Sequence, residues 1–249
     1  MNIKFGLLIL LITSFTAAHA QNWGGGVDDE NVHFGFTFQY NNSTYKIQRQ
    51  PNWRAPFRDP ETGTPLTDSL SALYSKSSPG FGIGFVINGR ISNNLDVRMT
   101  PTLVFSDRLA AYEYVQPAVI NTAFSNYEQK VAATLVEFPL GIKIKSNRRN
   151  NFRAYMLYGA KYTIDIASKK KLDDSGNDYI YKLLKNRKNY FSYEAAFGMD
   201  LYFEYFKMSP EIKLSYSLKN LLDNTEANPY NAPIDKLMLR HVTFSLFFE

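Results

Sequence analysis

The sequence of 249 residues contains no cysteine, which excludes disulfide bonds, thiolate metal sites and cysteine nucleophiles. Beyond the first 20 residues, no segment approaches the run of about 18 apolar residues that predicts a membrane-spanning helix. Histidine is scarce, and neither His33 nor His241 has a second histidine at metal-ligand spacing. We therefore expect no helical membrane span, no metal and no cofactor.

A strong bias toward one sign of charge is also missing. Lys and Arg number 28 against 23 Asp and Glu, and the basic residues are scattered along the chain instead of gathered on one helix or face. A nucleic-acid-binding domain concentrates its basic residues in a patch or stripe. We expect these residues to lie mostly on solvated loops and turns, and we expect no nucleic-acid partner.

The first residues have the three parts of a secretory signal peptide. Lys4 supplies a positive start, Phe5–Ile12 an apolar core and Ala18–Ala20 an A-x-A cleavage site. The apolar core is too short for a spanning helix. We expect residues 1–20 to be removed on export, residues 21–31 to form a Gly-rich periplasmic lead-in, and residues 32–249 to form a single domain.

Alternation of apolar and polar residues dominates the mature chain, and residues 131–166 show it most clearly. Even positions are largely apolar on both sides of a polar turn, Ser146–Asn151, while most odd positions are small or charged. Successive strand side chains point to opposite faces, so the pattern predicts two strands with one apolar face. Each strand is longer than the five or six residues typical of soluble domains, and a bilayer-crossing strand needs about nine to eleven. The hairpin therefore indicates a membrane barrel.

The same alternation predicts six further strands. They cover residues 32–42, 80–91, 95–105, 190–203, 206–218 and 237–248. The connections between strands alternate between long and short, with the long ones at residues 43–79, 106–130, 167–188 and 219–236. Outer-membrane barrels have an even number of strands, short periplasmic turns and longer external loops. We expect an all-β fold, an eight-stranded antiparallel transmembrane β-barrel in the bacterial outer membrane.

The composition of the two faces predicts which one contacts lipid. A lipocalin-like soluble barrel would enclose its apolar faces. Here the apolar faces are rich in aromatic residues, and the opposite faces are rich in Gly, Ala, Ser and Thr, which suit the crowded inside of an eight-stranded barrel. We expect the apolar faces to contact lipid, with an outer aromatic girdle that includes Tyr112, Tyr114, Tyr162 and Tyr190.

Ten charged residues fall on the faces predicted to point inward, five acids and five bases. They are Asp96, Arg98, Glu137, Lys143, Arg153, Lys161, Glu194, Asp200, Glu211 and Lys213. Buried charges are costly unless they are paired, and eight strands leave an interior filled by side chains. We expect a structural network of ion pairs that fills the bore, with no catalytic role and no porin activity.

Two further motifs resemble sites of known chemistry. Gly80-x-Gly82-x-Gly84 lacks the strand before it and the helix after it that a dinucleotide site requires, so we expect inward strand glycines that make room. Some small outer-membrane barrels modify lipids with a histidine, a serine and an acid near the rim. His33 with a serine such as Ser192 is one candidate set, although the sequence does not place the two side by side.

The segments VEFPLGIKIKS, FRAYMLYGAKYTIDI and RHVTFSLFFE, with the size, the leader and the spacing of the elements, resemble the PorT family of outer-membrane barrels. This resemblance implies a non-enzymatic component of the type IX secretion system of Bacteroidota, which supports export and maturation of secreted proteases, adhesins and gliding components. It implies other secretion-system proteins as partners, and it supplies no catalytic motif. The last residue, Glu249, departs from the aromatic residue that usually ends such barrels.

Two alternatives to this function remain open. One is a lipid-modifying outer-membrane enzyme, which would need His33 or His241 beside a serine and an acid at the membrane level. The other is a structural or adhesive barrel without a secretion role. The long external loops carry several tyrosines, and aromatic loops on a rigid scaffold favour contacts with proteins.

Overall fold

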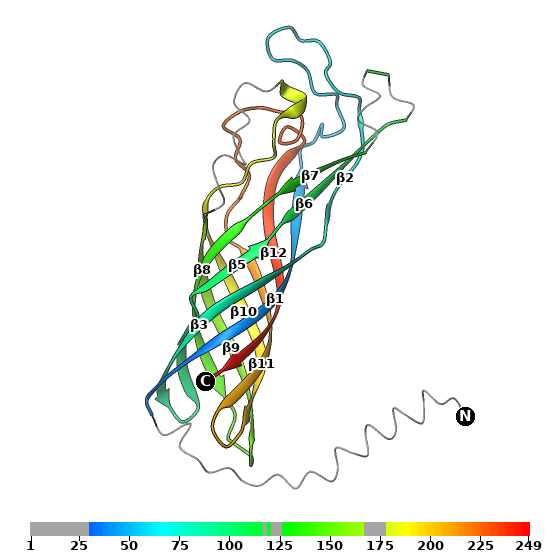
Figure 1. The fold of residues 1–249 in the computed structure, drawn as a ribbon. Helices are drawn as coiled ribbons and strands as arrows, with labels where there is room; N and C mark the ends of the chain where they lie inside the picture. The colour runs from blue at the N-terminus through cyan, green and yellow to red at the C-terminus, as the bar shows by residue number, and fades with distance from the viewer. Residues whose placement is uncertain (1–29, 117–118, 121–125, 167–177) are drawn as a thin grey trace, which may run out of the picture.

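The computed structural model describes residues 30–116, 119–120, 126–166 and 178–249. The expected signal peptide and nearly all of the expected lead-in lie outside the described residues. Within them the chain forms a closed antiparallel barrel of tilted strands (Figure 1). In the part of the chain that the structure describes, no helix is long and apolar enough to cross a membrane.

The barrel wall consists of nine strand segments that make eight barrel strands, because β4 and β5 are successive parts of one strand. They are β1 (Val32–Arg49), β3 (Ser78–Ser92), β4 (Leu95–Met99), β5 (Thr102–Ser106), β8 (Thr134–Lys145), β9 (Phe152–Asp165), β10 (Asn189–Tyr202), β11 (Lys207–Ser217) and β12 (Ile234–Phe248). Each pairs with its neighbours in chain order, and β12 pairs with β1 to close the barrel. The predicted eight-stranded antiparallel barrel is confirmed.

A three-stranded sheet extends the barrel at the end that carries the long connections, which we call the outer end. It contains β2 (Leu70–Lys76), β6 (Arg108–Tyr114) and β7 (Asn126–Val131), which continue β3, β5 and β8 beyond the barrel (Figure 1). The sequence prediction of continuous loops over residues 43–79 and 106–130 is therefore wrong in part. These strands point most of their apolar residues inward and, apart from the buried Arg108, their charged residues outward. This is the reverse of the barrel strands below them, because the outer sheet stands in water and not in lipid.

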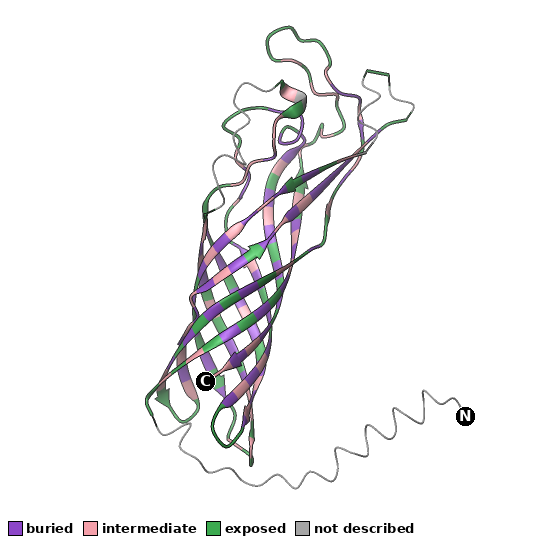
Figure 2. Ribbon diagram, viewed as in Figure 1, coloured by how far each residue is buried: buried purple, intermediate pink, exposed green. Residues whose placement is uncertain are grey.

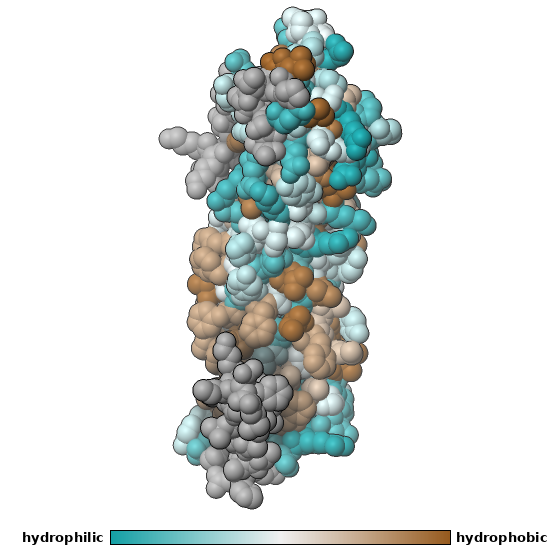
Figure 3. Space-filling view, turned by 90° about the vertical axis from the view of Figure 1, so that its right-hand side faces the viewer, coloured by the Kyte–Doolittle hydropathy of each residue, from teal (hydrophilic) through white to brown (hydrophobic). Residues whose placement is uncertain are grey.

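The outward faces of the barrel strands form an apolar belt. Phe34 and Phe85 are 71% and 72% exposed, and similar side chains surround the barrel. Burial alternates residue by residue along the strands (Figure 2), and the space-filling view shows apolar side chains on one face of the lower half, below a polar outer half (Figure 3). An apolar surface of this extent is unfavourable in water. The predicted orientation, with the aromatic faces outward, is confirmed.

The predicted outer girdle is wrong at three of its four residues. Tyr112, Tyr114 and Tyr190 are at most 5% exposed and lie in the interior of the outer half. Tyr162 does point outward, and its ring lies 4.8 Å from that of Phe191. The error arises because Tyr112 and Tyr114 belong to the outer sheet, where they face inward, and because Tyr190 lies on the inward face of β10.

The short turns lie at the opposite end, which we call the inner end. In the predicted turn at residues 146–151, Asn150 adopts a left-handed backbone conformation with a φ of 53°. Asparagine tolerates this conformation better than most residues. The polar composition of this turn therefore matches its geometry.

The inward position of the glycines in β3 is confirmed. The close packing around Gly84 predicts that an added side chain would destabilise the barrel. A Cβ atom at Gly84 would lie 2.6 Å from the carbonyl oxygen of Pro101, so we expect Gly84→Ala to lower the free energy of unfolding by about 1–3 kcal/mol. Urea unfolding in lipid vesicles measures this. Gly89→Ala is the control, since the atom nearest to a Cβ at Gly89 would be 3.8 Å away. Equal losses of stability in the two variants would show that crowding at Gly84 is not the cause.

Candidate functional site

The bore of the barrel holds the charged residues that the sequence singled out. Nine of the ten are buried, and the tenth, Arg153, is half buried. The structure joins eight of them in ion pairs with each other. These are Arg98 with Glu211, Lys143 with Asp200, Lys161 with Glu137, and Lys213 with Glu194. Asp96 pairs with a residue outside the predicted set.

Arg98 is the centre of this network. Its Nη1 donates a hydrogen bond to Glu211 Oε2 at 2.9 Å, and the Tyr155 hydroxyl donates to the same oxygen at 2.9 Å. The guanidinium also lies over the rings of Tyr155 and Phe247, at 5.0 and 4.6 Å from their centroids. These residues come from β4, β11, β9 and β12, so the contacts cross the bore.

Lys143 forms the second central pair. Its Nζ lies 2.8 Å from both carboxylate oxygens of Asp200, and the Ser209 hydroxyl donates to Asp200 at 2.7 Å. The Lys143 ammonium also lies 3.9 Å from the centroid of the Tyr155 ring. Hydrogen bonds and cation–π contacts of this kind offset the desolvation of a buried ion pair.

Sequence reasoning missed three members of the network. Lys145 pairs with Asp96 at 2.5 Å, and Lys207 pairs with Glu249 at 2.8 Å. Glu249 also lies 3.7 Å from Arg98, so the residue that departs from the usual barrel ending closes the inner end of the bore with its carboxylate. The alternation of each strand places all three at inward positions, and that signal was present in the sequence.

A second polar layer lies higher in the bore, around Arg108. The guanidinium donates to the Tyr190 hydroxyl at 3.2 Å and lies 3.9 Å from the Asp165 carboxylate. Arg108 is 1% exposed. The sequence prediction placed this residue in a loop, so its interior role was not foreseen.

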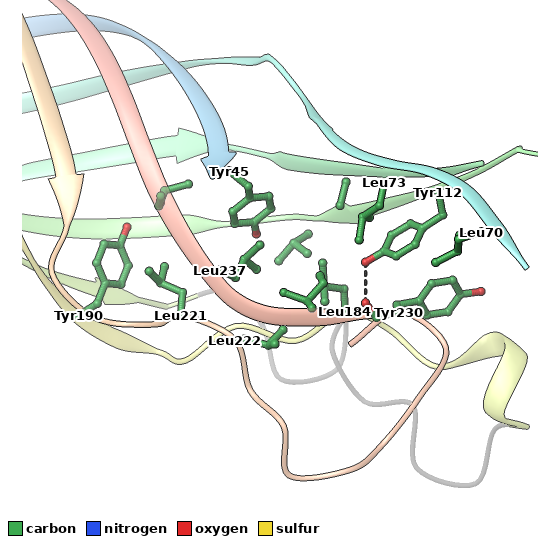
Figure 4. Close-up of a cluster of buried hydrophobic side chains, with 14 of the residues drawn as sticks. Tyr45, Leu70, Leu73, Tyr112, Leu184, Tyr190, Leu221, Leu222, Tyr230 and Leu237 are labelled. Atoms are coloured by element: carbon green, nitrogen blue, oxygen red, sulfur yellow. Dashed lines mark hydrogen bonds between the residues drawn. The ribbon is translucent and has the colours of Figure 1, made fainter. Parts of the chain in front are cut away.

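Above Arg108 the interior becomes apolar. The outer sheet, β1, β10 and β12 enclose a cluster of tyrosines and aliphatic residues, and the connections around residues 184 and 221–230 add side chains from above (Figure 4). The Tyr112 hydroxyl donates to the backbone oxygen of Tyr230 at 2.7 Å, which ties the last long connection to the sheet. The outer end of the barrel is therefore filled by a packed hydrophobic core.

The last connection is held in place by two buried asparagines. Asn228 Oδ1 accepts backbone hydrogen bonds from Tyr230 and Asn231, each at 2.9 Å, and Asn231 Oδ1 accepts one from Asn228 at 2.8 Å. Such reciprocal bonds satisfy backbone groups that a buried loop would leave unpaired. The described part of this connection is a defined cap on the barrel.

A pocket of about 310 Å³ opens on this outer cap, between the connection that follows β1 and the one that precedes β12. Trp53, Phe57 and Tyr114 line it with several prolines. Burial raises the pKa of Tyr114 to about 12, so its hydroxyl stays protonated at neutral pH. The guanidinium groups of Arg49 and Arg54 each lie over the Trp53 ring, at 4.6 and 5.0 Å from its centroid. Trp, Tyr and Arg are the residues that contribute most to protein–protein interfaces.

The structure separates the histidine and serine proposed for lipid chemistry. His33 lies near the inner end on β1, while Ser192 is buried near the outer end on β10 (Figure 1). His241 has different neighbours: it stands opposite Ser43 on β1 and opposite Ser215 on β11. His241 is 4% exposed, and its Nε2 makes no hydrogen bond within the described residues.

Comparison with known proteins gives the family. A family model described as outer membrane protein beta-barrel domain matches residues 19–223. No curated protein matches the chain. Similar solved structures include Neisserial surface protein A, with 9% identity and a TM-score of 0.41 over 88% of this chain and 98% of that one.

Two further solved structures are similar. OprG from Pseudomonas aeruginosa has 12% identity and a TM-score of 0.40, over 86% of this chain and 93% of that one. Ail of Yersinia pestis, crystallised with the heparin analogue sucrose octasulfate, has 11% identity and a TM-score of 0.36, over 88% and 99%. The family model covers more than half of the chain, so this protein belongs to the outer membrane protein beta-barrel domain family and is an outer-membrane barrel.

Proposed function

We propose that the protein is a non-enzymatic outer-membrane component of the type IX protein secretion system, which supports export and maturation of secreted proteins and gliding adhesins. The observation that carries a non-transport role is the filled bore. Ion pairs occupy its lower part, and a hydrophobic core occupies its outer end. A barrel closed in this way acts through its surfaces.

The secretion role itself draws support from the sequence. The segments at residues 136–146 and 152–166, with the closing segment at residues 240–249, resemble the PorT family. The outer cap supports contact with partner proteins, because it presents a pocket lined by aromatic residues and prolines with arginines at its side. Aromatic residues and arginine are enriched at protein–protein interfaces.

A strain that lacks the gene tests the secretion role. We expect loss of secreted proteases from the medium and loss of gliding, both restored by the wild-type gene on a plasmid. Normal secretion and gliding in the deletion strain would refute the proposal and favour a structural or adhesive barrel.

Complementation of the same strain tests the role of the cap. We expect Trp53→Ala to reduce protease export about tenfold, because truncation of a central aromatic residue at an interface costs about 1.4 kcal/mol or more. Glu61→Ala is the control, since Glu61 is exposed on the same connection. Western blots of outer membranes must show equal amounts of both variants; equal export by both would exclude the pocket as the contact site.

One observation favours a second candidate, a lipid-modifying enzyme. His241 stands between two serines in the register, and Glu194 on β10 stands opposite Ser215. We nevertheless expect His241→Gln to leave lipid A unchanged in mass spectra of the outer membrane and to leave protease export intact. A change in the acylation of lipid A with normal export would replace the secretion proposal by the enzymatic one.

A further inference from the structure

A groove of about 470 Å³ lies on the outside of the barrel, where its strands bend into the outer sheet. Phe81 and Phe105 form one side of the groove, and Ile166 lines it from β9's end. Ala132 and Ala133 contribute only small side chains. The groove is therefore an open space in which apolar side chains form one side, while polar atoms, including those of Ser106 and Asp107, line the rest.

The backbone explains why the groove forms at this position. Three neighbouring barrel strands are interrupted there, at Ser77, at Asp107 and at residues 132–133. Between the pairs Lys76–Leu109 and Gly80–Ser106, one strand has one residue more than its neighbour, which is the arrangement of a β-bulge and bends the strand. The Ser106 amide still donates to the Ala133 oxygen at 3.2 Å, so the wall stays connected behind the groove.

The groove also interrupts a row of aromatic residues. Tyr40 stands opposite Phe81, and Phe81 stands opposite Phe105, with the two phenyl rings stacked at 5.1 Å. The next strand places Thr134 opposite Phe105. An aromatic residue at this position would fill the space that Thr134 and Ala132 leave open.

The surroundings fix the level of the groove relative to the membrane. Phe81 and Ile166 are 60% and 52% exposed and belong to the apolar belt. On the outer side of the groove, Lys130 pairs with Asp107 at 2.6 Å, and both side chains are more than one-third exposed. The groove lies between these regions, where acyl chains meet headgroups.

We propose that this groove binds the acyl chain of a phosphate-bearing lipid of the outer leaflet, with the Lys130 ammonium facing the headgroup. The apolar side of the groove, formed by Phe81, Phe105 and Ile166, faces lipid and has acyl chains as its neighbours, and an empty groove would forfeit those contacts. Lys130 has three donors and can contact a phosphate while it keeps Asp107. The groove binds lipid whether or not the protein takes part in secretion.

Native mass spectrometry of the full-length protein, extracted from outer membranes in mild detergent, tests this. We expect the wild-type protein to retain one lipid molecule. Ala132→Trp fills the groove, so the lipid-bound fraction falls about tenfold. The control is Ile142→Trp on the same strand, where the side chain is 51% exposed to lipid away from the groove; it should retain the lipid as the wild type does.

Three results would overturn the inference. They are equal retention by the Ala132→Trp and wild-type proteins, equal loss in both tryptophan variants, and a bound species that proves to be a lipoprotein or a peptide. If Ala132→Trp does not fold, Thr134→Phe fills the same space by completing the aromatic row, and the same loss is expected. Lys130→Ala should shift retention toward lipids without phosphate, while unchanged lipid selectivity would exclude the headgroup contact.

Discussion

Arg98→Met is expected to lower the free energy of unfolding by about 3–5 kcal/mol, because it removes one partner of a buried ion pair. Among the described residues, the remaining carboxylate, Glu211, then keeps only Lys213 at 3.6 Å and the Tyr155 hydroxyl. Arg98 is 2% exposed, and its guanidinium lies 2.9 Å from Glu211 and 3.7 Å from Glu249. Urea unfolding of the barrel in lipid vesicles, followed by mobility on cold gels, measures the loss.

The double variant Arg98→Met with Glu211→Leu should recover part of this loss, since it removes both charges of the pair. Lys76→Met is the matched control: Lys76 pairs with Glu128 at 2.6 Å, yet both side chains are more than 40% exposed. An exposed pair contributes about 0–1 kcal/mol. A loss at Lys76 as large as that at Arg98 would show that burial of the network is not what stabilises the barrel.

Phe85→Arg is expected to destabilise the barrel in a bilayer by about 2–4 kcal/mol, the cost of an arginine on the lipid face near the midplane. Phe85 is 72% exposed and stands between two other exposed belt residues on β3, Ile83 and Ile87. The folded fraction after refolding into vesicles, measured at several urea concentrations, gives the change.

Tyr74→Arg serves as the control for position. Tyr74 is 39% exposed on the outer sheet, which stands in water, so a surface substitution should stay within about 0.5 kcal/mol. A water-soluble barrel would tolerate both substitutions equally. Equal, small effects would therefore contradict a membrane location for the belt.

Local alternation was sufficient to predict the barrel strands and their orientation. Strand residues alternate between the two faces wherever the strand lies in the fold, so Phe81 and Asp96 were placed correctly from their immediate neighbours. The outer sheet was missed because its strands are short and because most of its apolar side chains point inward, whereas those of the barrel strands point outward. The sequence does not mark where the membrane ends, so Tyr112 was placed in a girdle and Arg108 in a loop.

The pairing of the interior charges could not be predicted in the same way. Arg98 and Glu211 are 113 positions apart, and their contact depends on the tilt and register of strands on opposite walls. The alternation along each strand shows which side chains point inward, but it does not show which charged residue each of them pairs with. The groove beside Phe105 was equally out of reach, since it depends on interruptions in three strands that coincide only after folding.

The orientation of the strands relative to lipid is the central claim, and the absence of cysteine allows a direct test. Single cysteines placed in turn at residues 80–89 of β3 can be spin-labelled in the protein reconstituted into vesicles. We predict high accessibility to oxygen and low accessibility to a water-soluble nickel reagent at Phe81, Ile83, Phe85 and Ile87. The even positions should be protected from both reagents, whereas strong nickel accessibility at the odd positions would contradict the membrane orientation.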